Sequence, residues 1–389
     1  MTADRLYFDW NATAPLRPEA RAAMTAALAV NGNPSSVHAE GRAARHVVEN
    51  AREQVARLAG AEPRNVTFTS TATEANALGL TPALATAGEK HKRDKLLVSA
   101  IEHPSVLNGG RFSGASAVEM LPVTGAGILD LHALRSALAR TERALVSVML
   151  ANNETGVIQP IVEIAEIVHG AHGLLHVDAV QAPGRIDCRI GELGADLLTL
   201  SSHKLGGPQG AGALIRRGDI HIGEALIKGG GQERGLRAGT ENVAAIAGFG
   251  AAAAAALAAT QADAARMAEL RDMLEIGLKA ATPDVVIFGA TSPRLPNTAL
   301  FAVPGMKAET AIIAFDLNGI AVSSGSACSS GKVTASHVLA AMGVEPALAR
   351  GAIRVSLGPT TSETEIERFL ETWIMLSASL VKERRGIAA

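Results

Sequence analysis

The sequence predicts an α/β fold, with a mainly parallel central sheet wrapped by helices and a smaller α+β domain beside it. Short apolar runs rich in branched residues alternate with longer helical patterns through the first two thirds of the chain. These runs are nearly continuous in their hydrophobicity, which is typical of strands covered on both faces. A chain of 389 residues with 48% hydrophobic content is also long enough for a large core.

The expected strands are spaced so that a helix fits between most of them. They occupy residues 66–69, 96–99, 144–150, 174–177, 197–200 and 213–215. Further along, residues 243–260 carry no charge and are mostly alanine. Because alanine has the highest helix propensity but gains little free energy on transfer to lipid, this stretch predicts a buried or half-buried helix rather than a membrane span.

From Glu269 onward the pattern changes to a helix, two strand-like runs at residues 285–288 and 297–303, and further helices. This change predicts a second, smaller α+β domain. We expect a large domain over residues 15–255. Residues 1–14 are too few to fold alone, so we expect them to pack against the cleft or to join residues 256–389 in the small domain, which carries the loop around Cys328.

Charge and cysteine content narrow the class of protein. The formal charge is -2, so no general field attracts nucleic acid or an anionic membrane, and we expect small molecules and specific proteins as partners. Only two cysteines occur, Cys188 and Cys328, far apart in the chain. Their number argues against a disulfide framework and favours the cytoplasm, and the N-terminus lacks a signal-peptide pattern. Cys188 lies among apolar residues, so we expect it to be a buried structural cysteine.

Polar side chains follow five of the expected strands. They include Thr73, His103, Asn153, Asp178 with Gln181, and the run Ser201-Ser202-His203-Lys204. Ligands of open α/β sheets bind beyond the carboxyl ends of the strands, so these side chains predict one common site. Each of them alone has an ordinary alternative, a helix cap or a turn.

Two features of these strand ends indicate a site for pyridoxal 5'-phosphate (PLP). Lys204 is a candidate for a Schiff base with the cofactor aldehyde, and Asp178, one strand away, is a candidate partner of the pyridine nitrogen. The turn at residues 70–74 precedes a helical pattern, and the N-terminus of a helix binds phosphate. An ordinary capping box formed by Thr71 and Glu74 is the other interpretation, and both can hold because a cap need not occupy every donor.

In these residues the chain resembles the cysteine desulfurases, a branch of the class V aminotransferase family with the type I PLP fold. The resemblance covers almost the whole chain, and its ordered motifs are highly specific. They are residues 7–13 and 33–38, Glu102-His103-Pro104, residues 151–156 and 176–181, Ser201-Ser202-His203-Lys204, Arg237-Ala238-Gly239-Thr240, residues 323–331 and residues 353–358. The chain departs from the usual pattern at Thr71 and at Trp10-Asn11.

The resemblance implies a role for each matching residue. Lys204, Cys328 and His103 are catalytic, with Lys204 linked to the cofactor, His103 on the ring face and Cys328 receiving sulfur as a persulfide. The expected cofactor contacts are Ala72, Thr73, His103, Asn153, Asp178, Gln181, Ser201, His203, Lys204 and, from the other subunit of a homodimer, Thr240. The expected substrate contacts are Asn153, Arg354 and Asn11.

The implied activity is conversion of L-cysteine to L-alanine, with sulfur passed to an acceptor or cluster scaffold protein for iron–sulfur assembly or another sulfur-transfer pathway. No resident metal is expected, although Cys328 is expected to pass sulfur to, or transiently contact, a cluster on a partner. Alternatives on the same fold are an aminotransferase, for which Cys328 has no use, and a selenocysteine-specific lyase. A noncatalytic binding or scaffold protein is the remaining alternative. A yellow purified protein with an aldimine absorbance band would nearly exclude it.

Overall fold

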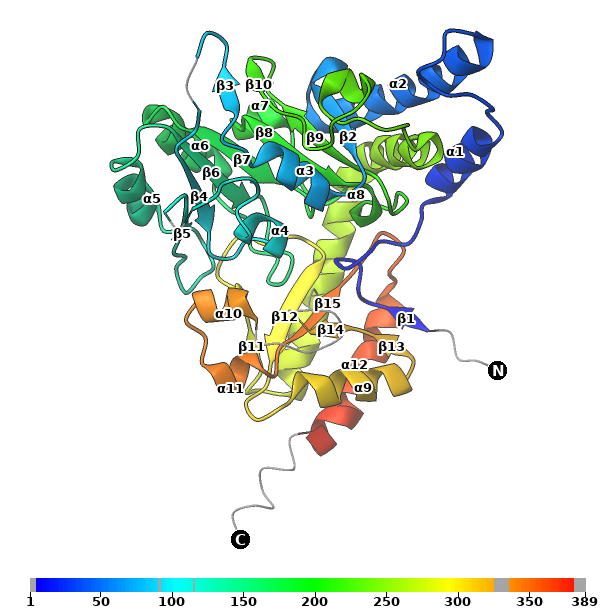
Figure 1. Ribbon diagram of the computed structural model, residues 1–389. Helices are drawn as coiled ribbons and strands as arrows, with labels where there is room; N and C mark the ends of the chain where they lie inside the picture. The colour runs from blue at the N-terminus through cyan, green and yellow to red at the C-terminus, as the bar shows by residue number, and fades with distance from the viewer. Residues whose placement is uncertain (1–4, 90–91, 115, 325–335, 381–389) are drawn as a thin grey trace.

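The computed structural model describes residues 5–89, 92–114, 116–324 and 336–380, and its upper part in Figure 1 is built around one large sheet. Seven strands lie in this sheet. In spatial order they are β2 (Val66–Thr69), β9 (Gly212–Arg216), β8 (Leu197–Ser201), β7 (Leu174–Asp178), β6 (Ala144–Met149), β4 (Lys95–Ser99) and β5 (Val118–Leu121). Each expected strand of the large domain is present.

The large sheet is parallel except at β9, which runs antiparallel to both of its neighbours, β2 and β8. The central strands β6, β7 and β8 are buried along their whole length. Helices cover both faces, so each strand can be continuously apolar. The mainly parallel sheet predicted from these runs is confirmed. The register pairs Asp178 with both Met149 and Thr199, so the ends of three strands lie side by side.

Helices and short strands connect and cover this sheet (Figure 1). They are α1 (Pro18–Leu28), α2 (Ala39–Ala59), α3 (Ala72–Gly79), α4 (Pro104–Leu107), α5 (Leu131–Leu138), α6 (Ile161–Gly170), α7 (Ile190–Leu193), the 3-10 helices η1 (Pro63–Asn65), η2 (Ser202–Lys204) and η3 (Gln232–Gly235), and the paired strands β3 (Leu84–Thr86) and β10 (Ile220–Ile222). Helix α3 begins at the N-cap Thr71, directly after β2, and α4 begins at the N-cap His103, shortly after β4.

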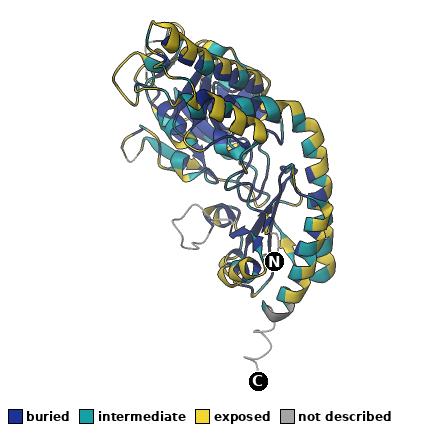
Figure 2. Cartoon of the chain, turned by 90° about the vertical axis from the view of Figure 1, so that its right-hand side faces the viewer, coloured by how far each residue is buried: buried dark blue, intermediate teal, exposed yellow. Residues whose placement is uncertain are grey.

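The long helix α8 (Val243–Ala281) joins the upper and lower parts of the molecule (Figures 1 and 2). It contacts α1 and α2 above and α12 below. Among the described residues, α8 alone has the length and apolar composition of a membrane span, but 50% of that window is buried inside the protein. These contacts agree with the buried or half-buried helix that the alanine-rich sequence predicted. The expected domain boundary at residues 255 and 256 falls inside this continuous helix.

The lower part contains a four-stranded antiparallel sheet, β11 (Val286–Ile287), β12 (Thr298–Ala302), β15 (Ile353–Ser356) and β14 (Ser323–Ser324), in that order. Its helices are α9 (Ala308–Leu317), α10 (His337–Ala341), α11 (Pro346–Ala349) and α12 (Glu363–Leu380). Strand β1 (Leu6–Tyr7) pairs in parallel with β13 (Ile320–Ala321), so the N-terminal segment lies against this part.

Buried aromatic side chains form the core of the lower part. Phe315 stacks on Phe369, with ring centroids 5.0 Å apart, and Trp373 meets Phe301 edge to face at 5.3 Å. All four are fully buried. Removing one such ring from a packed core typically costs about 3–5 kcal/mol. This cluster therefore fixes α9 and α12 against β12, next to the strand β15 that enters the site.

Candidate active site

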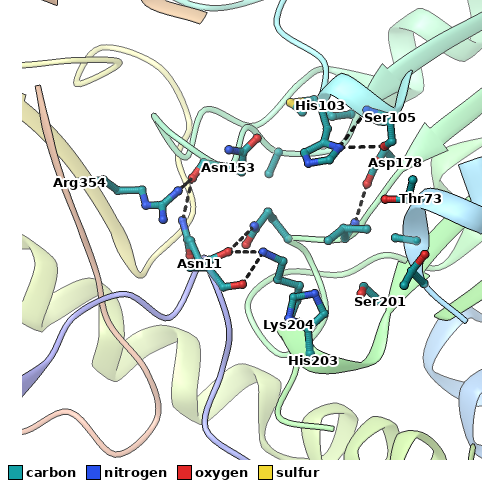
Figure 3. A pocket seen from close by; sticks show the side chains of 17 residues that line it. Asn11, Thr73, His103, Ser105, Asn153, Asp178, Ser201, His203, Lys204 and Arg354 are labelled. Atoms are coloured by element: carbon teal, nitrogen blue, oxygen red, sulfur yellow. Dashed lines mark hydrogen bonds between the residues drawn. The ribbon is translucent and has the colours of Figure 1, made fainter. Parts of the chain in front are cut away.

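A cavity of about 340 Å³ lies at the carboxyl ends of β6, β7 and β8. Its walls contain almost all the residues that the sequence assigned to the site (Figure 3). These are Asn11, Ala72, Thr73, His103, Asn153, Asp178, Gln181, Ser201, His203, Lys204 and Arg354. Thr240 does not line the cavity and is exposed, and Cys328 lies outside the described residues. The side chains that follow the predicted strands therefore lie around one cavity.

Lys204 comes from the short helix η2, directly after β8. Its Nζ donates hydrogen bonds to the carbonyl oxygens of Asn11 and Ala12, at 2.6 and 2.7 Å. The neighbouring His203 ring lies 3.2 Å from Thr13 Oγ1, and burial, with the charge of Lys204, lowers the pKa of His203 to about 4. The N-terminal segment thus holds the lysine amine at the cavity wall beside a neutral imidazole.

Asp178 ends β7 and faces the cavity with both oxygens oriented by donors. Its Oδ1 accepts from the backbone N–H of Val180 at 3.1 Å, and its Oδ2 accepts from Asn76 Nδ2 at 3.0 Å. An ionised carboxylate only accepts hydrogen bonds, so two fixed donors leave its remaining lone pairs for a cationic N–H in the cavity. That is the chemistry a pyridinium nitrogen requires.

His103 caps α4, and its Nδ1 accepts from the backbone N–H of Ser105 at 3.2 Å. Ser105 Oγ lies 2.8 Å from the same nitrogen, as Figure 3 shows. Burial lowers the pKa of His103, and the positive charge of Lys204 acts in the same direction, whereas Asp178 opposes both. The ring is therefore a neutral imidazole with Nε2 as its remaining functional nitrogen.

The turn between β2 and α3 has the geometry of an anion site. Thr71 Oγ1 accepts from the N–H of Glu74 at 3.1 Å, while Glu74 binds the N–H of Ser70 at 2.8 Å instead of that of Thr71. Only half of the capping box that was the other interpretation of this turn therefore forms. Gly212 lets β9 approach the turn, because a Cβ there would lie 2.5 Å from the Thr71 carbonyl carbon. Ala72 and Thr73 then present the first turn of the helix to the cavity.

Arg354 reaches the cavity from β15 of the lower sheet, and its side chain is only 3% exposed. Its Nη1 donates to the carbonyl oxygen of Asn153 at 2.9 Å, and its Nη2 donates to Asp9 Oδ1 at 2.7 Å. Its buried Nε has no partner among the described residues. A buried guanidinium with an unused donor is suited to a carboxylate ligand.

Asn11 lines the same wall, but its side chain is used internally. Its Nδ2 donates to Thr298 Oγ1 at 2.9 Å and to the carbonyl oxygen of Asn153 at 3.2 Å. Its own carbonyl oxygen accepts from Gln181 Nε2 at 3.0 Å as well as from Lys204. In this structure Asn11 contributes to the site chiefly through its backbone.

The sequence did not indicate the residues that hold the cavity-lining side chains in place. Arg185 donates to the backbone and side-chain oxygens of Gln181, and complete burial, with the charge of Arg354, lowers the pKa of Arg185 to about 9. Ser105 and Asn76 were missed as well. The one usable signal for Arg185 was its closeness in the chain, since it stands four residues after Gln181.

Known proteins resemble this chain over most of its length. Residues 6–369 match the class-V aminotransferase family. A cysteine desulfurase of Cereibacter sphaeroides is 43% identical over 374 residues, which cover 95% of this chain and 94% of that protein. The chain belongs to the cysteine desulfurase family. The cysteine desulfurase IscS of Dictyoglomus turgidum is 42% identical and covers 94% of this chain, with 93% of its own length matched.

Solved structures share this fold. A NifS-like protein from Rickettsia africae superposes with a TM-score of 0.86 at 36% identity, over 96% of this chain and 99% of that one. A structure described as SspA in complex with cysteine gives a TM-score of 0.76 at 29% identity, over 92% of this chain and 100% of that one. The family, the enzyme class and the α/β fold predicted from the sequence are confirmed.

The residues around the cavity fit PLP, the cofactor that family membership implies. An amine stands at Lys204, an oriented carboxylate at Asp178, and a helix N-terminus at Thr73. These are the three kinds of group that an aldehyde, a pyridine nitrogen and a phosphate need. A volume of about 340 Å³ also lies within the range of small-molecule sites.

Proposed function

We propose that this protein converts L-cysteine to L-alanine with PLP as its cofactor and transfers the sulfur to Cys328. The observation that carries the proposal is the convergence on one cavity of Lys204, Asp178, the N-terminus of α3 and the buried guanidinium of Arg354. The first three groups would bind the cofactor, and Arg354 would bind the substrate.

When bound, PLP supplies an aldehyde for the substrate amine and a ring that accepts electrons from the Cα–H bond. Lys204 Nζ provides the anchoring amine and carries protons at Cα. Asp178 would keep the ring nitrogen protonated, which would make the ring a better electron acceptor. Ala72, Thr73, Ser201 and His203 would hold the phosphate, and Gln181, Asn153 and His103, which line the same cavity, would contact the ring.

Arg354 orients the substrate by its carboxylate. Its guanidinium is fixed by Asp9 and by the carbonyl oxygen of Asn153, so little rotamer entropy is lost when a carboxylate binds. Strand β14 pairs Ser323 with Arg354. Ser324, the last residue of β14, stands four residues before Cys328, at most about 14 Å of extended chain. This short connection supports a thiol that reaches the substrate bound at Arg354.

The sulfur step is a balanced exchange. The Cys328 thiolate attacks the sulfur of the substrate, and the carbon–sulfur bond breaks with its electron pair left on carbon. That carbon takes up a proton, so L-alanine is released and Cys328 carries a persulfide. Both sulfurs are oxidised and the carbon is reduced, and no other oxidant is needed.

We further propose a cytoplasmic homodimer that delivers this sulfur to an acceptor or cluster scaffold protein, for iron–sulfur assembly or another sulfur-transfer pathway. Thr240 is exposed and lies away from the cavity of its own chain. Its position supports a role at the cavity of the partner subunit.

The decisive experiment incubates the purified, PLP-loaded protein with L-cysteine and dithiothreitol and measures alanine and sulfide. Equal amounts of the two products are expected. A parallel assay with L-selenocysteine separates a desulfurase from a selenocysteine-specific lyase. Pyruvate and ammonia in place of alanine would contradict the proposal, because they indicate elimination without sulfur transfer to the enzyme.

A further inference from the structure

A chain of hydrogen bonds runs behind the cavity and links two of its functional side chains. Asn76, on α3, donates from Nδ2 to Asp178 Oδ2 at 3.0 Å and to Ser105 Oγ at 2.9 Å. Ser105 Oγ lies 2.8 Å from His103 Nδ1. Figure 3 shows His103, Ser105 and Asp178 close together. Asn76 is completely buried and does not line the cavity itself.

The direction of each hydrogen bond follows from the chemistry of its groups. A carboxylate only accepts, so the part of Asn76 that faces Asp178 must be its NH₂ group. The second N–H of that group points to Ser105 Oγ. The Ser105 hydroxyl accepts this bond, which leaves its own hydrogen for His103 Nδ1.

These directions fix the tautomer of His103. Its Nδ1 faces the backbone N–H of Ser105 at 3.2 Å, which can only donate, and the Ser105 hydroxyl. Nδ1 is therefore the unprotonated nitrogen, and the neutral ring carries its proton on Nε2. His103 thus offers an N–H donor at Nε2, on the side of the ring away from Ser105.

Fold stability does not explain an amide at position 76. Asn76 Oδ1 is buried without a hydrogen-bond partner among the described residues. A buried, unsatisfied carbonyl destabilises a fold, and an apolar side chain of similar size would avoid that loss. What an apolar side chain could not supply is the pair of N–H donors that reach Asp178 and Ser105.

We propose that Asn76 is a positioning residue that couples Asp178 to His103 through Ser105. It orients the oxygen that meets the cofactor ring nitrogen and, through the Ser105 hydroxyl, the Nε2 proton of His103. The inference rests on the proposed function, because it takes Asp178 and His103 as cofactor contacts. Asn76 acts only through these two side chains.

Three variants separate the two halves of this coupling. Asn76→Asp turns a donor into an acceptor, so the Ser105 hydroxyl points to the new carboxylate and away from His103, and a second negative charge lies beside Asp178. Ser105→Ala removes only the link to His103. Ser105→Thr keeps the hydroxyl and should restore wild-type behaviour.

Nitrogen NMR measures the link from Asn76 to His103 and the link from Asn76 to Asp178 separately. In cofactor-free protein with ¹⁵N-labelled histidine, Asn76→Asp and Ser105→Ala should shift the Nδ1 signal of His103, which is assigned by its loss in His103→Gln. In protein loaded with PLP labelled at the ring nitrogen, Asn76→Asp should move that signal toward the unprotonated position. Ser105→Ala should leave the ring-nitrogen signal unchanged. PLP affinity of Asn76→Asp should fall by at least about tenfold, the effect of losing one hydrogen bond to a charged group.

Asn65→Ala is the matched control, because it removes another buried amide, at η1 and away from the cavity. It should leave both NMR signals unchanged. If both NMR signals of Asn76→Asp stay at their wild-type positions, the inference is wrong. This holds even if the wild-type enzyme releases alanine normally and the proposed function stands. If Asn76→Asp does not fold, an unshifted His103 signal in Ser105→Ala overturns it equally. If the wild-type protein binds no PLP, the proposed function fails, and the His103 signal of cofactor-free protein still decides the coupling.

Discussion

The amine of Lys204 lies 2.6 Å from the carbonyl oxygen of Asn11, although the two residues are 193 positions apart in the chain. Asn11 belongs to the N-terminal segment, whose strand β1 pairs with β13 of the lower part. Strand β15 of the same part contributes Arg354 to the cavity. The lysine therefore stands where both parts of the molecule meet, and its position depends on their contact.

Lys204→Ala should abolish alanine release, because it removes the amine that links to the cofactor and carries protons at Cα. PLP should remain bound noncovalently through the phosphate contacts at α3. Borohydride treatment followed by peptide mass spectrometry provides the measurement. A lysine still joined covalently to PLP in this variant would show that Lys204 is assigned wrongly.

Asp178→Ala should weaken PLP binding and slow the reaction at full PLP occupancy, since the protonated ring nitrogen loses its counterion. A hydrogen bond to a charged group typically contributes about 1.5–3 kcal/mol, so PLP affinity should fall by about one to two orders of magnitude. Titration of the cofactor-free protein with PLP measures this change. Wild-type turnover at saturating PLP would rule out the role given to Asp178.

The apolar runs made most of the large sheet predictable, but not the direction of its strands. A run as short as that of β9 has the same composition in either direction, so its antiparallel course could not be predicted. Strand β5 was missed because it is an edge strand whose Glu119 and Met120 are not buried. Its pattern therefore lacks the continuous hydrophobicity of a central strand.

The residues that line the cavity could be predicted to lie together because each follows a strand or a recognisable motif. The residues that hold these side chains in place were not predictable. Asn76 lies inside a helical pattern, and its partners Ser105 and Asp178 are 29 and 102 positions away. Only the packing of α3 against the strand ends brings them together. Residues that act through other residues thus leave little trace in local sequence.

Arg354→Lys should raise the KM for L-cysteine by about ten- to a hundredfold, with a smaller effect on kcat. Lysine keeps the charge but loses the planar fork that binds Asp9, Asn153 and a carboxylate together. Steady-state alanine release as a function of L-cysteine concentration measures both constants. The control is Arg350→Lys, at an exposed position after α11, which should change neither constant. An unchanged KM in Arg354→Lys would contradict a substrate contact.

His176 should make the cofactor-free protein less stable as the pH falls from 6.5 to 4. Its ring is completely buried between Ser147 Oγ and Thr199 Oγ1, at 2.8 and 2.9 Å, and burial lowers its pKa from 6.5 to about 4. Between these values the unfolded chain binds a proton that the folded protein does not. Its contribution to stability is therefore present above pH 6.5 and is lost toward pH 4.

The shift corresponds to about 3 kcal/mol in the free energy of unfolding. His176→Gln cannot titrate but retains hydrogen-bonding groups, so its stability should depend less steeply on pH in this window. Urea unfolding at a series of pH values gives the comparison. Parallel curves for wild type and variant would show that His176 does not hold this pKa in the folded protein.

Cys188 provides an internal reference for the reactivity of Cys328. It is buried beneath α2 with its Sγ 3.9 Å from the Leu58 carbonyl oxygen, and burial raises its pKa to about 12. The expectation of a buried structural cysteine is confirmed. Since the thiolate is the reactive form, Cys188 should resist both alkylation and sulfur transfer in the folded protein.

Cys328→Ser should separate cofactor chemistry from sulfur transfer, because serine keeps the size of the side chain but its hydroxyl is far less acidic than a thiol. The variant should bind PLP with the wild-type absorbance and should still change its spectrum when L-cysteine is added. It should release little alanine and carry no persulfide. In the wild-type protein, mass spectrometry after L-cysteine treatment should place the extra sulfur on Cys328 and leave Cys188 unmodified. If Cys328→Ser releases alanine at the wild-type rate, sulfur leaves by another route and the proposed transfer to Cys328 fails, even though the PLP site at Lys204 and Asp178 would stand.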